Sequence, residues 1–225
     1  MIKSKEFLNT LQKSKINFFT GVPDSLFSSL CSKLEKNSQH HPAPNEGSAI
    51  GLAIGYHLST NKLPLVYLQN SGLGNIVNPI ASLTNKKKFK IPLFLIIGWR
   101  GEMKKKIQVK DEPQHVFQGR ITEELLKILQ IKYKILDDRT NFKKDVRELA
   151  NFSLKNSKPV AFLVRRNTFY KEKKKIKIDK KSLTREIVLQ TIVKLIPKNS
   201  PIVSTTGVLS RELMEINNSL NKKNS

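Results

Sequence analysis

A nearly uninterrupted apolar run at residues 91–97, Ile-Pro-Leu-Phe-Leu-Ile-Ile, constrains the fold more than any other part of the chain. Successive side chains of a strand point to opposite faces of its sheet, so a strand of this composition needs apolar partners on both faces. Strands of this kind lie in parallel sheets whose two faces are both covered by helices. The run therefore predicts a central strand of a parallel α/β sheet.

The segments on either side of this run alternate between the two hydrophobic periodicities, which is typical of a doubly wound parallel sheet flanked by helices. Further strands are predicted at 16–20, 65–68, 133–136 and 160–164, and helices at 6–11, 26–34, 46–58, 76–83, 122–129 and 142–154. A long polar loop is expected at 99–114. The helix at 46–58 is rich in small residues, which we interpret as a sign that another backbone packs close to it.

The chain divides into three parts by composition. Residues 1–170 are predicted to form the doubly wound domain, and 171–182 form a lysine-rich linker. Residues 183–225 show a helix at 183–195, a strand at 201–204 and a helix at 210–216. We interpret this last part as the start of a second α/β domain that is incomplete at the end of the chain.

The net charge of +23 raises the possibility of a nucleic-acid partner. The excess is mostly lysine, and much of it occurs in short runs in predicted loops, without interleaved aromatic residues or a nucleic-acid-binding motif. We therefore expect no nucleic-acid partner, and a basic nucleic-acid-binding protein remains the alternative.

No apolar run has the length of a membrane span, and the N-terminus lacks the apolar stretch of a signal peptide, so a cytoplasmic protein is expected. Cys31 is the only cysteine, which excludes an intrachain disulfide.

Glu46 is the first candidate for chemistry, because it lies between a strand end and the start of the small-residue helix. The helix dipole favours the ionised form of a carboxylate in that position, whereas burial favours the protonated form. Alone, the triplet Asn45-Glu46-Gly47 indicates no more than dipole complementarity.

Five blocks in this order give the triplet a context. They are 20–25 (Thr-Gly-Val-Pro-Asp-Ser), 45–58 around Asn-Glu-Gly, 67–75 (Tyr-Leu-Gln-Asn-Ser-Gly-Leu-Gly-Asn), 97–102 (Ile-Gly-Trp-Arg-Gly-Glu) and 111–115 (Asp-Glu-Pro-Gln-His). This series resembles the N-terminal, pyrimidine-binding part of the thiamine-diphosphate-dependent decarboxylases. The likeness is greatest to the phosphonopyruvate decarboxylases, and it extends more distantly to the pyrimidine-binding subunit of the sulfopyruvate decarboxylases.

The resemblance implies decarboxylation of a 2-oxo acid, with phosphonopyruvate giving phosphonoacetaldehyde and carbon dioxide. Glu46 would hydrogen-bond ring nitrogen N1′ of the cofactor's aminopyrimidine and so favour the tautomer that activates the thiazolium, which acts as the electron sink. Asp24 would border the substrate and relay protons, although it may equally be a helix N-cap. The other residues implied are Asn70, Ser71, Gly72, Leu73 and Asn75 near the cofactor, and Arg100 and His115 near the phosphonate.

Two departures from the family pattern stand out. The loop at 103–110 is longer and more basic, and the Gly-Asp-Gly motif of the second domain is absent. That domain binds the diphosphate through Mg²⁺, so the metal's oxygen ligands are expected from outside this chain. We expect a homo-oligomer or a hetero-oligomer with a diphosphate-binding subunit. The alternatives are a sulfopyruvate-specific subunit and a truncated, inactive remnant or binding module.

Overall fold

The computed structural model describes residues 1–84, 88–104, 107–171, 183–197, 200–205 and 207–222. The chain forms two compact units, Met1–Glu172 and Lys173–Ser225. The predicted linker at 171–182 lies, apart from its first residue, outside the described residues. The domain boundaries predicted from composition therefore stay a prediction.

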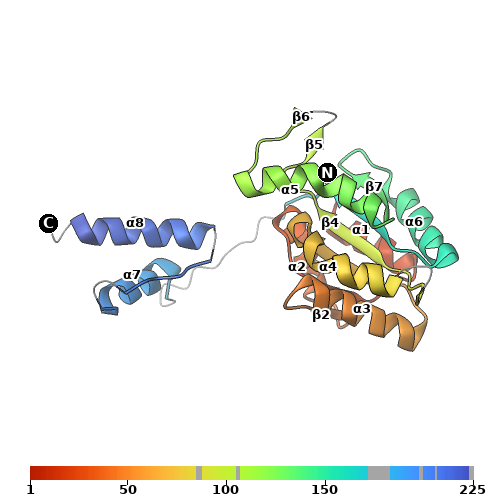
Figure 1. The fold of residues 1–225 in the computed structure, drawn as a ribbon, viewed down its shortest axis with the longest axis horizontal. Coiled ribbons are helices and arrows are strands. Elements are labelled where there is room, and N and C mark those ends of the chain that lie inside the picture. Colours follow the sequence, from red (N-terminus) through yellow and green to blue (C-terminus); the bar gives the residue numbers. More distant parts are fainter. Residues whose placement is uncertain (85–87, 105–106, 172–182, 198–199, 206, 223–225) are drawn as a thin grey trace. The chain divides into compact units, whose positions relative to one another are not determined.

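The first unit is built on a parallel sheet with the strand order β2-β1-β3-β4-β8-β7 (Figure 1). The strands are β1 (Phe19–Gly21), β2 (His40–Pro42), β3 (Leu65–Gln69), β4 (Phe94–Gly98), β7 (Lys132–Leu136) and β8 (Val160–Val164). The apolar run at 91–97 supplies β4, which pairs with β3 on one side and β8 on the other. The prediction of a central strand in a doubly wound parallel sheet is therefore confirmed.

Helices cover both faces of this sheet, as the alternation of strands and helices predicts. The helices are α1 (Ser4–Lys13), α2 (Ser28–Leu34), α3 (Glu46–Thr60), α4 (Leu73–Pro79), α5 (Pro113–Ile128) and α6 (Phe142–Asn156). Apolar side chains of α1, α2 and α6 share one buried cluster, and those of α3, α4 and α5 share the other. Alternate residues of β4 contribute to each cluster, Phe94 and Ile96 to the first and Leu95 and Ile97 to the second.

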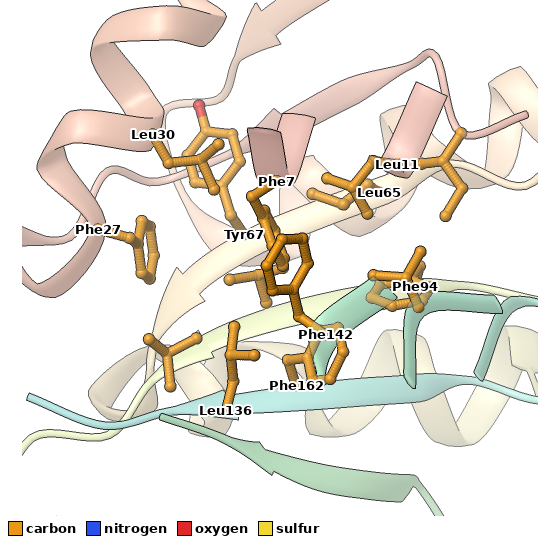
Figure 2. Close-up of a cluster of buried hydrophobic side chains, with 14 of the residues drawn as sticks. Phe7, Leu11, Phe27, Leu30, Leu65, Tyr67, Phe94, Leu136, Phe142 and Phe162 are labelled. Carbon is orange, nitrogen blue, oxygen red and sulfur yellow. The ribbon is translucent and has the colours of Figure 1, made fainter. Parts of the chain in front are cut away.

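Phenylalanine rings dominate the first cluster (Figure 2). Phe7 of α1 is fully buried, and its ring centroid lies 5.5 Å from that of Phe142, 6.1 Å from that of Phe162 and 5.2 Å from that of Phe169. These are the tilted and edge-on geometries that aromatic pairs prefer. The ring of Phe7 therefore joins α1, α6 and β8 across one face of the sheet.

Local geometry differs from the sequence-based expectations in three places of the first unit. The first strand begins at Phe19 rather than at 16. Pro79 ends the regular part of α4, and residues Ile80–Thr84 continue as the π-helix η3, because proline has no N–H for the α-helical ladder. The loop predicted at 99–114 contains a short antiparallel hairpin, β5 (Met103–Lys104) with β6 (Ile107–Gln108), and ends where α5 begins.

The prediction that another backbone packs close to the small-residue helix α3 is confirmed only in part. A Cβ at Gly47 would lie 3.3 Å from the backbone oxygen of Asn75, so another backbone does approach the helix there. At Gly51 and Gly55 no atom of the described chain lies within 4 Å of a built Cβ. Within the described residues, the close approach of another backbone is therefore seen at Gly47 but not at Gly51 or Gly55, while Ala49, Ile50, Ala53 and Ile54 pack into the core.

The second unit contains two helices, α7 (Arg185–Leu195) and α8 (Val208–Lys222). Thr184 caps α7 by accepting a hydrogen bond from the backbone N–H of Ile187. Arg185 of α7 forms a bidentate ion pair with Glu212 of α8, so the two helices are joined by charge. The prediction of a strand at 201–204 is wrong, because residues 200–205 are described and belong to no strand.

In the part of the chain that the structure describes, no helix is both long and apolar enough to cross a membrane.

Candidate active site

The strand order places a topological switch point at the carboxyl ends of β1 and β3, and we call the region outside these strand ends the crevice. The chain passes from β1 to β2 on one side and then returns to β3 on the other, so the direction of winding reverses between β1 and β3. In open parallel sheets ligands bind at such a switch point, outside the carboxyl ends of the strands. Asp24 follows β1, whereas Gln69 ends β3 and the 3₁₀ turn η2 (Asn70–Gly72) comes directly after it.

Glu46 lies beside this crevice in the first turn of α3. Asn45 caps the helix by accepting a hydrogen bond from the N–H of Ser48 at 2.8 Å, which fixes where the helix begins. The half-buried carboxylate of Glu46 accepts a hydrogen bond from Nδ2 of Asn75 at 2.7 Å. A Cβ at Gly72 would lie 2.3 Å from Oε1 of Glu46, so a side chain there would displace this carboxylate. The structure thus brings together Glu46, Gly72 and Asn75, three of the residues that the sequence predicts.

Replacing Gly72 tests how tightly the carboxylate of Glu46 is held. Gly72→Ala displaces the carboxylate of Glu46 from its hydrogen bond with Asn75, and we expect a cost of about 0.5–1.5 kcal/mol in the free energy of unfolding. Gly74→Ala is the matched control, because a Cβ there meets nothing within 4 Å and alanine suits helix α4 better than glycine. Thermal unfolding should show a lower Tm for the first variant and an unchanged or higher Tm for the second. Equal Tm values for the two variants would contradict this packing.

A second group of polar side chains surrounds Asp24, which is 4% exposed. Its Oδ1 accepts a hydrogen bond from the N–H of Leu26 at 2.8 Å, and its Oδ2 accepts one from Nε2 of Gln69 at 2.5 Å. Ser71 completes the group, since its hydroxyl donates to Oε1 of Gln69 at 2.7 Å. Asp24 therefore caps the short helix η1 (Ser25–Phe27) and also borders the crevice. Gln69, which the sequence reasoning did not single out, is the link from Asp24 to η2.

Asn70 points away from this group and holds the loop that follows β4. Its Nδ2 donates to the backbone oxygen of Arg100 and to the hydroxyl of Thr122, both at 2.9 Å, while its Oδ1 accepts from the N–H of Arg100 at 3.1 Å. The amide of this buried side chain is thus engaged on both its donor and its acceptor sides. Asn70 positions the backbone of Arg100 in the described structure, and Leu73, its neighbour in the predicted cofactor loop, lies in the core.

Arg100 and His115 meet through Asp111. Nε and Nη2 of Arg100 donate to the two carboxylate oxygens of Asp111 at 2.8 and 2.5 Å, and Nδ1 of His115 lies 3.1 Å from Oδ1. The N–H of Gly101 also donates to Asp111, at 3.0 Å. The guanidinium of Arg100 and these further donors hold the pKa of the Asp111 carboxyl far below its usual range, whereas the Asp111 carboxylate raises the pKa of Arg100.

Asp111 should therefore stabilise the fold in a pH-dependent way. Its pKa is lowered on folding, so the stabilisation is fully present above the unfolded value of about 4 and is lost as the pH falls through the lower folded pKa. Asp111→Asn should cost about 1.5–3 kcal/mol at pH 7, the range for hydrogen bonds to charged groups, and the gap should narrow below pH 4. Urea unfolding at several pH values measures this difference in the free energy of unfolding between the variant and the original chain. The control Asp138→Asn changes an exposed carboxylate and should shift stability by less than about 0.5 kcal/mol. A gap that stays constant down to about pH 2 would show that the charge is not what matters.

No group of three or more His, Cys, Asp or Glu side chains in the described residues is arranged to hold a metal ion.

The fold agrees with that of the known proteins that this chain resembles. The profile of the thiamine pyrophosphate enzymes' N-terminal TPP binding domain matches residues 4–126, which include all of the crevice residues that precede α5 and most of α5 itself. The chain belongs to this family of thiamine pyrophosphate enzymes. Its curated relatives place it with decarboxylases of the sulfopyruvate and phosphonopyruvate kind.

Two of these relatives differ in how much of the chain they match. The sulfopyruvate decarboxylase subunit alpha of Methanococcus maripaludis is 34% identical over 73% of this chain and 95% of its own length. The phosphonopyruvate decarboxylase of Streptomyces viridochromogenes is 28% identical over 95% of this chain and 57% of its own length.

Solved structures agree on the fold. The benzoylformate decarboxylase of Polynucleobacter necessarius superposes with a TM-score of 0.54 at 14% identity, over 86% of this chain and 36% of that chain. A thiamine diphosphate-dependent 4-hydroxybenzoylformate decarboxylase of Rhodococcus jostii gives a TM-score of 0.51 at 17% identity, over 85% of this chain and 37% of that chain.

Proposed function

We propose that this chain is the pyrimidine-binding part of a thiamine-diphosphate-dependent decarboxylase whose substrate is a short 2-oxo acid carrying a second anionic group. The observation that carries the proposal is the carboxylate of Glu46, held by Asn75 and Gly72 at the switch point of a thiamine pyrophosphate enzyme domain. Phosphonopyruvate is the first substrate that we propose, and sulfopyruvate is the second.

The crevice residues fit the pyrimidine of thiamine diphosphate. A half-buried carboxylate with a single described hydrogen-bond partner keeps acceptor capacity for a protonated ring nitrogen. The absent Cβ of Gly72 lets the carboxylate of Glu46 lie directly against η2. Glu46 would therefore orient the pyrimidine and hold the proton at its ring nitrogen, with Asn75 fixing the carboxylate. When bound, the cofactor supplies the electron sink for cleavage of the bond to the carboxyl group.

Asp24 is the proposed proton-relaying group on the substrate side. It is buried, yet Gln69 and Ser71 connect it by hydrogen bonds to the turn that carries Gly72. An acid in this position can hold or move a proton near the reacting carbon while the surrounding side chains exclude water.

The two substrate assignments rest on different observations. Alignment with the phosphonopyruvate decarboxylase takes in 95% of this chain and therefore most of the α7–α8 unit as well. Alignment with sulfopyruvate decarboxylase subunits alpha is stronger in identity, at 34–36%, but takes in 69–73% of the chain. The longer match favours phosphonopyruvate, and the higher identity favours sulfopyruvate.

We further propose that the diphosphate and its Mg²⁺ are bound by a separate diphosphate-binding subunit, because the Gly-Asp-Gly motif is absent from this sequence. The name "subunit alpha" of the sulfopyruvate enzymes supports a hetero-oligomer. Magnesium prefers oxygen ligands and usually keeps several waters, which suits a site shared with the cofactor's phosphates.

The direct test follows carbon dioxide and aldehyde release from each 2-oxo acid, with thiamine diphosphate and Mg²⁺. The chain is assayed alone and with a diphosphate-binding subunit of a sulfopyruvate decarboxylase. Turnover of either substrate by a mixture or by the chain alone supports the proposal, and the preferred substrate decides between the two assignments. A folded chain that turns over neither substrate in any mixture would leave the inactive remnant as the better description.

A further inference from the structure

A cavity of about 550 Å³ opens next to the crevice, on the side of Asp24. Its wall is formed by the start of η1, the loop after β4, the start of α5 and the segment that follows β8. The polar and charged side chains among its lining residues are Ser25, Arg100, Lys110, Asp111, Glu112, Arg166, Asn167 and Lys171.

Some charged side chains of this cavity have hydrogen-bond partners and others have none within the described residues. Asp111 is fully committed to Arg100, His115 and two backbone N–H groups. By contrast, no side-chain partner exists within the described residues for Lys110, Arg166 or Lys171, all of which are exposed. Glu112 also lines the cavity, so four basic side chains (Arg100, Lys110, Arg166 and Lys171) stand against two carboxylates (Asp111 and Glu112), and an excess of positive charge remains.

Arg100 is oriented toward this cavity from two directions. Asp111 holds its Nε and Nη2, and Asn70 holds its backbone. Nη1 remains, and its contact is with the hydroxyl of Ser25 at 3.4 Å, a long and weak hydrogen bond. A pre-oriented guanidinium nitrogen beside a hydroxyl and unpaired cations is an arrangement suited to a tetrahedral oxyanion.

We propose that this cavity binds the second anionic group of the substrate, a phosphonate or sulfonate, through Arg100, Ser25 and Arg166, with Lys110 and Lys171 supplying further charge. The inference rests on the proposed function and extends it, because it assigns a place to the group that separates these substrates from an ordinary 2-oxo acid. Ser25 directly follows Asp24, so an anion in the cavity leaves the rest of a three-carbon substrate at the crevice. Asp111 and Asn70 act as positioning residues, and His115 acts through Asp111 rather than on the anion.

The test uses unreactive analogues and needs neither cofactor nor partner subunit. The full-length chain, labelled with ¹⁵N, is titrated with 3-phosphonopropionate and with 3-sulfopropionate while amide chemical shifts are recorded. We expect saturable shifts confined to the residues around Ser25, Arg100 and Arg166. The ratio of the two dissociation constants distinguishes a phosphonate from a sulfonate ligand.

Charge-removing variants distinguish binding in this cavity from nonspecific binding of an anion to the basic surface. Arg166→Gln removes an exposed, unpaired cation of the cavity, and the double variant Lys110→Gln, Arg166→Gln removes two. We expect binding to weaken roughly threefold and about tenfold, as for partly exposed ion pairs. Arg147→Gln is the control, since Arg147 lines a second basic cavity of about 660 Å³ between α1 and α6. It should leave binding unchanged.

The outcomes separate this inference from the proposed function. Shifts spread over the basic surface, or equal weakening by Arg147→Gln and Arg166→Gln, would overturn the cavity assignment. An active assembled enzyme whose KM is the same in Arg166→Gln as in the original chain would also overturn it, while leaving the decarboxylase proposal intact. Localised binding of either analogue supports the cavity even if the assembled enzyme turns over neither 2-oxo acid.

Discussion

Glu46→Gln is expected to lower the decarboxylation rate of the assembled enzyme by about 100- to 10,000-fold, the range for loss of a positioned acid–base group. Glutamine keeps the size of the side chain and can still meet Asn75. It cannot supply the carboxylate that holds a proton at the pyrimidine nitrogen. Because the carboxylate is only half-buried and makes one described hydrogen bond, the stability of the chain should change little. Steady-state rates with saturating thiamine diphosphate, together with thermal unfolding, measure both effects.

Glu6→Gln is the matched control for this experiment. Glu6 also lies in the first turn of a helix, α1, where it pairs with Lys143 on the surface. Both variants lose the same interaction with a helix dipole, so any difference between them reflects the crevice. A rate for Glu46→Gln within about threefold of the Glu6→Gln rate would remove Glu46 from the chemistry.

Phe7→Ala is expected to produce the largest loss of stability, about 3–5 kcal/mol, as for truncation of a buried aromatic ring. The ring of Phe7 is fully buried among Phe142, Phe162 and Phe169, so alanine leaves a cavity between α1, α6 and β8 (Figure 2). Urea unfolding followed by the fluorescence of Trp99, the only tryptophan, reports on the first unit alone.

Phe117→Ala provides the comparison, because Phe117 on α5 is 66% exposed. Its truncation should change the free energy of unfolding by no more than about 0.5 kcal/mol. Similar losses for the two variants would mean that the ring of Phe7 does not hold the first face of the sheet together. Unchanged thermal stability of Phe7→Ala would lead to the same conclusion.

The sequence predicts the sheet well because its signals are local. The apolar run around Phe94 and Ile97 requires cover on both faces, and only a central parallel strand provides it. Glu46 is different, because its own triplet indicates no more than dipole complementarity and only the five blocks that resemble a known family make it a candidate. The wrong strand at 201–204 shows the limit of such signals, since a short apolar stretch forms a strand only where another strand is available to pair with it.

The connections within the site depend on contacts between segments that are distant in the sequence. Gln69 reaches Asp24 only because β1 and β3 are neighbours, and nothing in the local sequence marks that glutamine. Asn70 has the residue type expected of a ligand-binding turn. Its side-chain amide instead forms hydrogen bonds with the backbone of Arg100, which follows the neighbouring strand β4. Arg100 and His115 are predicted separately, whereas the carboxylate between them, Asp111, becomes visible only when the intervening hairpin is folded.

That hairpin is closed at its base. The N–H of Val109 donates to the backbone oxygen of Glu102, and Gly101 and Arg100 are both tied to Asp111. A loop whose two ends are fastened together can lengthen at its tip for only a small entropic cost, without displacing what lies beneath it. The longer and more basic loop that the sequence predicts at 103–110 would therefore leave Arg100 in place. A foreign peptide grafted between Lys104 and Ile107 should likewise leave Arg100 and Asp111 joined.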